Sequence, residues 1–570
     1  MSSHLSIRKM SIDESPEDEE EVPTAQTTIT SYCSSDVINE VMNPLIEQGL
    51  KAQNEGEEAG KFSFSFRQMA SSAKVTPVKD VAHLEEANHE EDTPNDKIKL
   101  ESIFEGLGSF GRFQQIQFIL ICIPIAFVSM HVMSWTFVVS SARKICNETN
   151  ETLVDGCEEL AYSASDRWDM NGDNAWIRAT VQSVYFVGQM IGSFTCGVMA
   201  DKIGRKKVLF WCLVLQVTCA LLLIIAPTWW IYALLKAGTG FTQPGIYGVA
   251  VVLGIELVGK QYRSFIAVIA NVFGVVGGII LSTMAYYIVD YRLLHAAIAI
   301  PSLIFITYYW VIHESARWLV SQEKYDDANV VLCATASMNK KTMPKDWADK
   351  MEKKVDVTAT KKKDSFGAVD LVRTPQMRKR TLANFVMWPV TTMMYYGMTM
   401  RSDVGGGSLF VTFVSSQLME LPAVIIVALL IDRLGRRIMY SGSIFTAGVF
   451  LLANWLTHDL IPNQYAVVML MIAKGAVSVS YTVMYTYTSE LFPTVIRNTA
   501  VGCCSTMARV GAVTASFIAF FLVDRYGRIV MIIPFTILAM CASIVSWFML
   551  PETVNKPLPD SISEIEGNKI

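Results

Sequence analysis

Four charged side chains lie within long apolar stretches of this chain, where a charge is costly unless it meets a partner or a water-filled space. They are Lys236, Glu420, Lys474 and Arg509. Arg509 stands about ten residues into its stretch, close to the middle of a membrane-spanning helix of ordinary length. A guanidinium there repels cations and binds a carboxylate or sulfate through two parallel hydrogen bonds. The pattern predicts a site for a charged solute, and Arg509 favours a solute with an anionic group, either an anion or a zwitterion.

Four tyrosines complete the predicted site. Tyr395 and Tyr396 are adjacent, whereas Tyr481 and Tyr485 are one helical turn apart and follow Lys474 by seven and eleven residues, on the same helix face. A buried tyrosine offers an apolar ring and a hydroxyl group, which suits varied amphiphilic organic ions. The alternatives are ordinary packing and a belt of aromatic residues at the membrane interface.

Three short motifs occur twice in the same order. They are GVMADKIGRKK (Gly197–Lys207) and ALLIDRLGRR (Ala428–Arg437), ELVGKQYR (Glu256–Arg263) and ELFPTVIR (Glu490–Arg497), HES (His313–Ser315) and PET (Pro551–Thr553). Their leading acidic residues are 231, 234 and 238 residues apart. Such a near-constant offset predicts two parallel structural halves. A large class of secondary transporters is built in this way.

We call the three motifs of each half its cassette. Each cassette places carboxylates and cations at predicted helix ends. A carboxylate there can pair with a cation of a neighbouring helix or cap that helix's N-terminus, and such contacts hold a gate until the halves rock. The alternative is that Lys and Arg only anchor helix ends. The predicted gating residues are Asp201, Gly204, Arg205, Glu256, Arg263, Glu314, Arg317, Asp432, Arg433, Gly435, Arg436, Glu490 and Arg497.

The composition excludes an ordinary soluble domain: 51% of the 570 residues are hydrophobic and only 18% are charged, and the mean hydropathy is +0.33. Each apolar stretch is long enough to cross a hydrocarbon core of roughly 30 Å. Twelve spans are predicted, near 113–138, 177–200, 207–226, 230–255, 264–288, 294–312, 381–401, 408–431, 438–456, 465–489, 499–522 and 529–550.

The spans divide the chain into five parts. Residues 1–98 form a predicted disordered, acidic tail, because the first 100 residues hold 20 Asp and Glu against 9 Lys and Arg. The first six-helix half covers 99–312 and begins with an amphipathic lead-in, Lys99–Gln114, expected to lie along the membrane surface. A linker loop at 313–380, the second half at 381–550 and a tail at 551–570 follow. Because the linker and the cassettes are rich in Lys and Arg, they and both termini are predicted to be cytoplasmic.

The loop after the first span is then extracellular. It contains two glycosylation sequons, at Asn147 and Asn150, together with Cys146 and Cys157. An extracellular loop is where N-glycosylation and a local disulfide both occur. We therefore expect glycans on both asparagines and a bond between the two cysteines.

The motif G-x-x-x-D-x-x-G-R-K-K resembles the signature of the major facilitator superfamily. HESARWLV, ELFPTVIRNTA and PET together resemble its organic cation/anion transporter family, over roughly residues 100–553. The resemblance implies an all-α membrane protein, with twelve transmembrane helices in two pseudo-symmetric six-helix halves, that moves small organic ions by alternating access. The first outer loop is shorter than is usual in this family.

The same resemblance bears on substrate charge. At the position of Arg509, cation carriers of the family generally have an aspartate, whereas carriers of anions and zwitterions have an arginine. Glu420 matches an acidic position of the family, but Val424 stands where many anion carriers have a lysine. A site with both Glu420 and Arg509 suits a zwitterion, or couples transport to protonation of Glu420. The alternative is a structural Arg509 that pairs with a helix carbonyl or with Glu420.

The sequence shows no phosphate-binding loop, paired-cysteine metal motif or catalytic triad. It therefore predicts no enzyme activity and no cofactor, and transport driven by a solute gradient. The expected partners are a small organic ion, a coupling ion or exchanged anion, and the lipid bilayer of the plasma membrane. The alternatives are an organic cation carrier and a non-transporting receptor or scaffold with the same fold. A sugar carrier is disfavoured, because the paired glutamines that sugar carriers have in the seventh span are missing from the corresponding segment here, TTMMYYGM.

Overall fold

Helices make up the secondary structure throughout the described part of the chain. The computed structural model describes residues 100–140, 163–343, 347, 369–405, 407–457, 460, 462–556, 559 and 561–566. The predicted acidic tail at 1–98 and the loop with Asn147, Asn150, Cys146 and Cys157 lie outside these ranges. The predictions of disorder, glycosylation and a disulfide therefore stay predictions.

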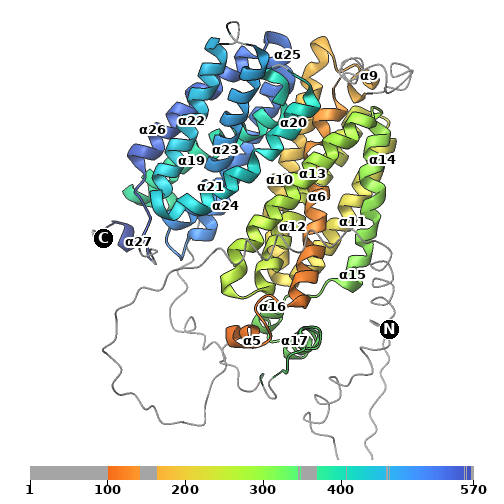
Figure 1. Cartoon of the computed structure of the whole chain (residues 1–570), viewed down its shortest axis with the longest axis vertical. Coiled ribbons are helices and arrows are strands. Elements are labelled where there is room, and N and C mark those ends of the chain that lie inside the picture. The colour runs from red at the N-terminus through yellow and green to blue at the C-terminus, as the bar shows by residue number, and fades with distance from the viewer. Residues whose placement is uncertain are drawn as a thin grey trace, which may run out of the picture. The chain divides into compact units, whose positions relative to one another are not determined.

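The first half consists of six passages through the bundle, whose helices are labelled in Figure 1. They are α6 (Arg112–Val138), α10 (Trp176–Ile203), α11 (Arg205–Ile225), α12 (Trp229–Leu257), α13 (Arg263–Tyr287) and a sixth passage made of α14 (Tyr291–Ser302), η4 (Leu303–Thr307) and α15 (Tyr308–Val311). Shorter helices flank them: α5 (Leu100–Gly106), α9 (Ala164–Arg167), η2 (Gly172–Ala175), η3 (Lys260–Tyr262), α16 (Ala316–Ser321) and α17 (Tyr325–Asn339).

The second half repeats this order. Its passages are α19 (Pro375–Met400), α20 (Leu409–Leu418) with α21 (Glu420–Leu434), α22 (Arg436–Thr457), α23 (Asn463–Leu491), α24 (Arg497–Phe517) with the π-helical η7 (Ile518–Leu522) and α25 (Val523–Tyr526), and α26 (Ile529–Met549). Its short helices are α18 (Asp370–Arg373), η6 (Ser402–Gly405) and α27 (Ile562–Glu566).

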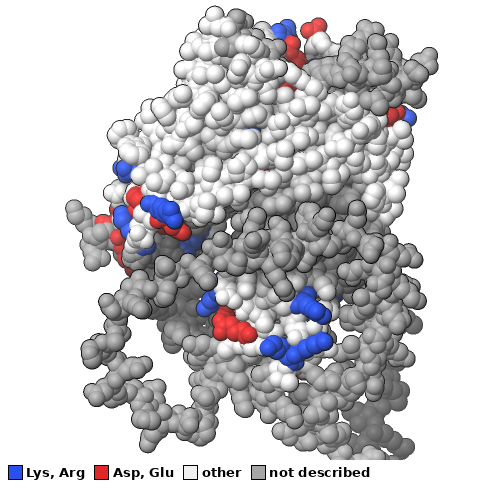
Figure 2. Space-filling model, in the orientation of Figure 1, with Lys and Arg blue, Asp and Glu red and all other residues white. Residues whose placement is uncertain are grey.

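Eleven of the described helical stretches are long and apolar enough to cross a membrane. The predicted span at 381–401 corresponds to α19, which has the length but is not among these eleven, because its apolar residues alternate with Asn384, Pro389 and several Thr and Tyr. Most of its later residues are buried by neighbouring helices, so protein rather than lipid surrounds them. Figure 2 shows the charged side chains near the ends of the bundle, with a nearly uncharged surface between them. This surface is what a multi-pass membrane protein presents to lipid.

Two predicted surface segments pack against the bundle instead. The amphipathic lead-in forms α5, whose Ile103 and Phe104 are buried by protein, so it is not simply a membrane-surface helix. The predicted linker loop contains α16 and α17, and α19 already begins within it at Pro375. Hydrophobic periodicity over such short stretches does not distinguish a lipid surface from a protein surface.

Side chains that follow the sixth passage cap the first helix of each half. Asn339, at the end of α17, accepts a hydrogen bond of 3.0 Å from the Phe113 backbone N–H at the start of α6. Glu566, in α27, accepts hydrogen bonds of 2.7 and 3.3 Å from the backbone N–H groups of Gln376 and Met377 at the start of α19. A polar side chain satisfies N–H groups that have no partner within the helix. Part of the predicted C-terminal tail is thus docked on the second half.

The halves contact each other through α10 with α24 and α13 with α20, as their neighbouring positions in Figure 1 illustrate. Within the first half, α10 and α12 pack very closely. A Cβ on Gly188 would lie 2.2 Å from the Ala237 carbonyl oxygen, and one on Gly240 would lie 2.1 Å from that of Tyr185. Small residues permit this approach of two helix backbones. Helix α10 is thus held firmly against α12 of its own half, while it also contacts α24 of the other half.

Candidate functional site

Two of the three predicted charges of the second half, Glu420 and Lys474, form a connected cluster. The Tyr395 hydroxyl donates to Glu420 Oε1 over 2.6 Å, and Lys474 Nζ lies 3.4 Å from the same oxygen. Lys474 Nζ also donates to Thr399 Oγ1 over 2.6 Å and lies 3.5 Å from the centroid of the Tyr395 ring. Since Lys474 is only 1% exposed, Glu420 is the counter-charge that makes its burial possible.

The four predicted tyrosines come together beside this cluster. Tyr395 and Tyr481 stack with their ring centroids 4.8 Å apart. Tyr396 lies edge-on to Tyr395 at 5.3 Å, and Tyr485 lies 5.7 Å from Tyr481. Phe186 of α10 contacts Tyr396 at 4.8 Å, so the first half reaches the same site. Tyr396 is buried, Tyr395 and Tyr481 are half-buried, and Tyr485 is 39% exposed.

Arg509 lies among tyrosines and has no carboxylate partner. It is 8% exposed, and its Nε has no hydrogen-bond partner. Tyr396, Tyr481 and Tyr485, together with Tyr185 from the first half, lie near its guanidinium. Within the described ranges no ion pair involves Arg509. Glu420 is engaged by Lys474 and Tyr395 instead, so the structure does not show the Glu420 pairing that was the structural alternative.

Lys236 is the buried lysine of the first half, at 0% exposure. Its ammonium donates to the His131 carbonyl oxygen over 2.7 Å and to Ser134 Oγ over 2.9 Å, and it lies 5.5 Å from the Tyr185 ring centroid. No carboxylate of the described chain pairs with it. With three cations against Glu420, the predicted site charges sum to +2 when all are ionised (3 − 1). Such a surplus attracts a substrate's anionic group.

The cassette of the first half is built around Arg205. Its Nη2 lies 3.1 Å from Asp201 Oδ1 and 3.3 Å from Glu256 Oε1. Glu314 accepts a hydrogen bond of 3.0 Å from the Lys206 backbone N–H and so caps α11. Gly204 has φ +112°, and a Cβ there would lie 2.3 Å from Glu314 Oε2. The glycine is therefore required by both its backbone conformation and the adjacent carboxylate.

The second cassette repeats this geometry. Arg436 lies 2.9 Å from Asp432 through Nη2 and 3.0 Å from Glu490 through Nε. Glu552 accepts hydrogen bonds of 2.8 and 3.0 Å from the backbone N–H groups of Arg436 and Arg437. Gly435, with φ +91°, again lies directly beneath the capping carboxylate.

The two predicted roles of the carboxylates, pairing with a cation and capping a helix, belong to different residues in both cassettes. The helix-capping carboxylates are those of Glu314 and Glu552, whereas Asp201 and Asp432 are exposed and pair with the arginine four residues further on. The reason is geometric, because each aspartate ends the preceding helix on the far side of the glycine turn. Its side chain reaches the arginine but not the N–H groups of the next helix.

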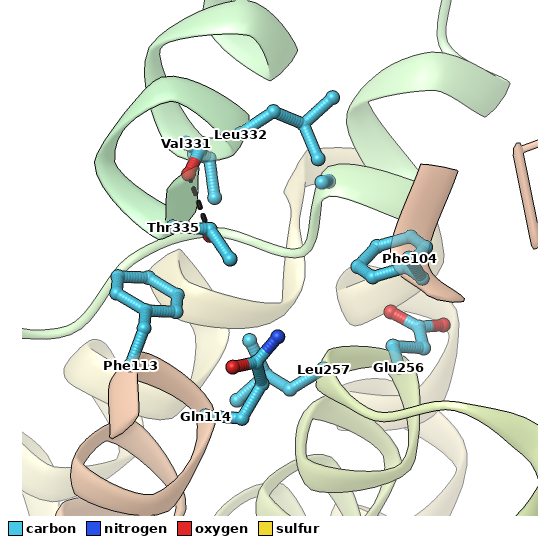
Figure 3. A pocket seen from close by; sticks show the side chains of 9 residues that line it. Phe104, Phe113, Gln114, Glu256, Leu257, Val331, Leu332 and Thr335 are labelled. Atoms are coloured by element: carbon cyan, nitrogen blue, oxygen red, sulfur yellow. Dashed lines mark hydrogen bonds between the residues drawn. The ribbon is translucent and has the colours of Figure 1, made fainter. Parts of the chain in front are cut away.

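Glu101 joins the cassette of the first half, although the sequence pattern did not identify it. Arg317 Nη1 lies 2.6 Å from Glu101 Oε2, and Arg263 lies 3.4 Å from Oε1. Arg263 therefore contacts Glu101, whereas Glu256 pairs with Arg205. Figure 3 shows the Glu256 carboxylate beside Phe104 of α5, where residues of several helices line a cavity of about 10 Å³. In the sequence, Glu101 is only one of two acidic residues of the amphipathic lead-in, beside Glu105.

Two predicted gating residues do not join these networks. Arg433 is exposed, and no ion pair involves it within the described part of the second half. Arg497 has buried Nε and Nη2 atoms without a hydrogen-bond partner among the residues that the structure describes. The contacts of Asp201, Arg205 and Glu256 thus recur at Asp432, Arg436 and Glu490. The contact of Arg263 does not recur at Arg497 within the described residues.

Acidification is expected to release α5. Hydrogen bonding from Arg317 holds the pKa of Glu101 below its usual value of 4.5. A carboxyl whose pKa is lowered on folding stabilises the protein above its ordinary pKa, and this contribution is lost as pH falls through the lowered value. Hydrogen exchange of residues 100–106, corrected for the intrinsic rate, should show protection at pH 6 that is lost below about pH 4. Glu101→Gln should lack that protection already at pH 6; unchanged protection in this variant would contradict the role of the carboxylate.

Comparisons with known proteins agree with this architecture. The family model described as "Sugar (and other) transporter" matches residues 118–563. The organic cation transporter protein of Drosophila melanogaster is 31% identical over 527 residues, which cover 82% of this chain and 94% of the relative. Human organic cation/carnitine transporter 2 is 31% identical over 422 residues, which cover 73% of this chain and 74% of the relative.

A solved structure of the xylose transporter XylE from E. coli in an inward open conformation has the same fold. It aligns with a TM-score of 0.55 at 14% identity, over 79% of this chain and 99% of that one. The likeness concerns the arrangement of helices alone. Family model, relatives and fold together show that the chain is a multi-pass membrane transporter of organic ions and not an enzyme. It belongs to the organic cation/anion transporter family of the major facilitator superfamily.

Proposed function

We propose that this chain carries small organic ions that bear an anionic group, zwitterions in particular, by alternating access. The observation that carries this proposal is Arg509, an almost fully buried guanidinium with no counter-charge among the described residues. A substrate carboxylate would supply that charge and, in a dry site, bind more strongly than it does in water. Glu420 does not compensate Arg509, because Lys474 and Tyr395 already engage it.

The tyrosines have a complementary role in the proposed site. Ring faces attract quaternary or protonated amines, so a carboxylate at Arg509 and an ammonium group against Tyr481 or Tyr485 together describe a zwitterion. Lys236, from the first half, adds positive charge, and Tyr185 links it to Arg509. The proposed substrate is thereby held by groups of both halves, as rocking about a central site requires.

The second candidate is an organic cation carrier. The names of the Drosophila and human relatives favour it, and so do the aromatic rings of the site. Against it stands the positive charge that a substrate cation would have to approach. A non-transporting receptor with this fold would bind without moving solute.

Uptake of three matched solutes separates these candidates. They are a quaternary ammonium carboxylate, its uncharged-amide analogue, which is a pure cation, and the carboxylate without the ammonium group. We expect saturable uptake of the zwitterion above that in cells with empty vector, and weak uptake of the cation. Uptake of the cation alone would establish the second candidate, and absence of all uptake at normal surface abundance would favour the receptor.

The cassettes are proposed to bias the gate without touching substrate. Replacing Arg205 with alanine removes the cation that joins Asp201 to Glu256 and should lower the maximal rate several-fold with little change in apparent affinity. Surface abundance is measured in parallel. Arg433→Ala, in which an exposed arginine of the other cassette is lost, is the matched control. Equal turnover of Arg205→Ala and parent protein would contradict the gating role.

We also propose a plasma-membrane location with both termini cytoplasmic, supported by the Lys and Arg content of the cassettes and of α19's first turns. Glycosidase treatment should then increase electrophoretic mobility, and Asn147→Gln combined with Asn150→Gln should abolish that shift. An unshifted parent protein from a glycosylating cell would contradict either the topology or the use of these sequons.

A further inference from the structure

We infer that Arg178 and Asp524 form the lock of a second gate, at the end of the bundle opposite the cassettes, which closes the substrate path on that face. This inference rests on the proposed alternating access. Arg178 lies in the first turn of α10, whose other end carries Asp201; these 23 residues of helix separate the two by roughly 35 Å. Asp524, in α25, follows the helix that begins at the cassette residue Arg497.

The lock joins the two halves directly. Arg178 Nη2 lies 2.8 Å from Asp524 Oδ2, and the two side chains are 13% and 28% exposed. Every other ion pair between described residues joins groups of the same half, including those of both cassettes. Partial burial and the short distance make this pair stronger than an exposed surface pair. The halves are therefore held by charge at the opposite face and not, among the described residues, at the cassette face.

Asp524 keeps a partner when the lock opens. Its Oδ1 accepts a hydrogen bond of 2.6 Å from Arg401 of the second half, which lies 3.3 Å from Asp403. Arg401 also donates to the Ala519 carbonyl oxygen, in the π-helical turn η7, over 3.2 Å. Arg401, Asp403 and Ala519 all belong to the same half as Asp524. Opening releases only Arg178, so no buried carboxylate is left uncompensated, and the cost of opening stays moderate.

Apolar contacts on the same face must part together with the lock. Phe410, at the start of α20, stacks on Phe137 of α6 at 5.7 Å and lies edge-on to Tyr286 of α13 at 5.3 Å. Ser282 Oγ of α13 donates to the Phe410 carbonyl oxygen over 3.2 Å. Aromatic packing and ion pairing thus seal this face between the same two halves. π-Helical turns such as η7 are frequent at functional sites.

Accessibility of a cysteine at position 282 tests the lock without any substrate. Ser282 is buried against Phe410 in the closed arrangement, so a thiol there reacts with a hydrophilic maleimide only when the face opens. The measurement uses full-length protein with Ser282→Cys in permeabilised membranes, and labelling of the parent chain is subtracted for its own cysteines. Arg178→Gln should raise the labelling rate about fivefold or more, since one charged contact no longer opposes opening.

Two further variants keep the result decisive. Arg178→Asp combined with Asp524→Arg restores opposite charges and should return the labelling rate toward that of the parent protein. Arg373→Gln, which removes an arginine that is 77% exposed and paired within the second half, is the matched control and should change nothing. If Arg178→Gln does not reach the membrane, Arg178→Met replaces it with the same expected result.

An unchanged labelling rate in Arg178→Gln, or a charge-swapped protein that labels as fast as the single variant, would overturn the lock. Failure of the proposed substrate class is recognised separately. In that case the zwitterion is not transported by the parent protein, yet position 282 still responds to Arg178→Gln as described.

Discussion

Replacing Arg509 with aspartate is expected to reverse the charge preference of transport. The change alters the charge of the site by two units at a side chain that is only 8% exposed, where water and salt screen a charge weakly. Uptake of the zwitterion or anion should fall about 30-fold or more, as expected for a lost buried charge pair, and uptake of an organic cation should rise. Radiotracer uptake, normalised to surface abundance, measures both.

Arg509→Lys is the matched variant for this prediction. Lysine keeps the charge but lacks the planar fork that binds a carboxylate through two hydrogen bonds, so part of the uptake should remain. An arginine with a purely structural role behaves differently, because both variants would then lose protein from the membrane and neither would gain a substrate. Normal anion or zwitterion uptake by membrane-inserted Arg509→Asp would remove the main support for the proposed substrate class.

Replacing Glu420 with glutamine is expected to destabilise the second half by about 3–5 kcal/mol, because it leaves the buried ammonium of Lys474 without its counter-charge. The thermal midpoint of the purified protein should fall clearly, and uptake should fall with it. The Tyr395 hydroxyl would keep a neutral acceptor but lose the charged one, which adds to the loss.

Lys474→Met, alone and together with Glu420→Gln, completes the thermodynamic cycle. The double variant should be more stable than Glu420→Gln alone, because no unpaired buried ammonium remains. A fall in stability that is simply the sum of the two single effects would contradict a direct coupling of these side chains. Uptake that recovers with stability would show that Glu420 acts through Lys474, whereas uptake that stays low would assign it a part in proton coupling or substrate binding.

The duplicated motifs of the cassettes could be predicted from the sequence because each consists of residues close together in the chain. The glycine turn between Asp201 and Arg205 fixes their distance locally, and the same holds for Asp432 and Arg436. The contact between Tyr481 and Tyr485 could also be predicted, because residues four apart lie on the same face of a helix. Four charges within apolar helices were likewise visible, because charges are rare there.

Other parts of the site depend on contacts that no local pattern contains. Glu101 meets Arg317 across 216 residues, and Arg178 meets Asp524 across an even longer stretch of the chain. Charges near helix ends are common in membrane proteins, so these residues did not stand out. Helix α19 shows a second limit of local patterns. It is more polar than the other spans because neighbouring helices, and not lipid, surround most of it.

The capping side chains also impose an order on biosynthesis. Helices α11 and α22 are each the third of their half, but Glu314 and Glu552, which bind their first N–H groups, follow the sixth. Asn339 and Glu566 bind the start of the first helices from still further along the chain. A nascent half therefore leaves two helix ends without these bonds until its last residues emerge from the ribosome. For the first half this occurs before the second half is made. For the second half it waits until Glu552 and Glu566 are made, and a premature stop before Glu552 would remove both caps at once.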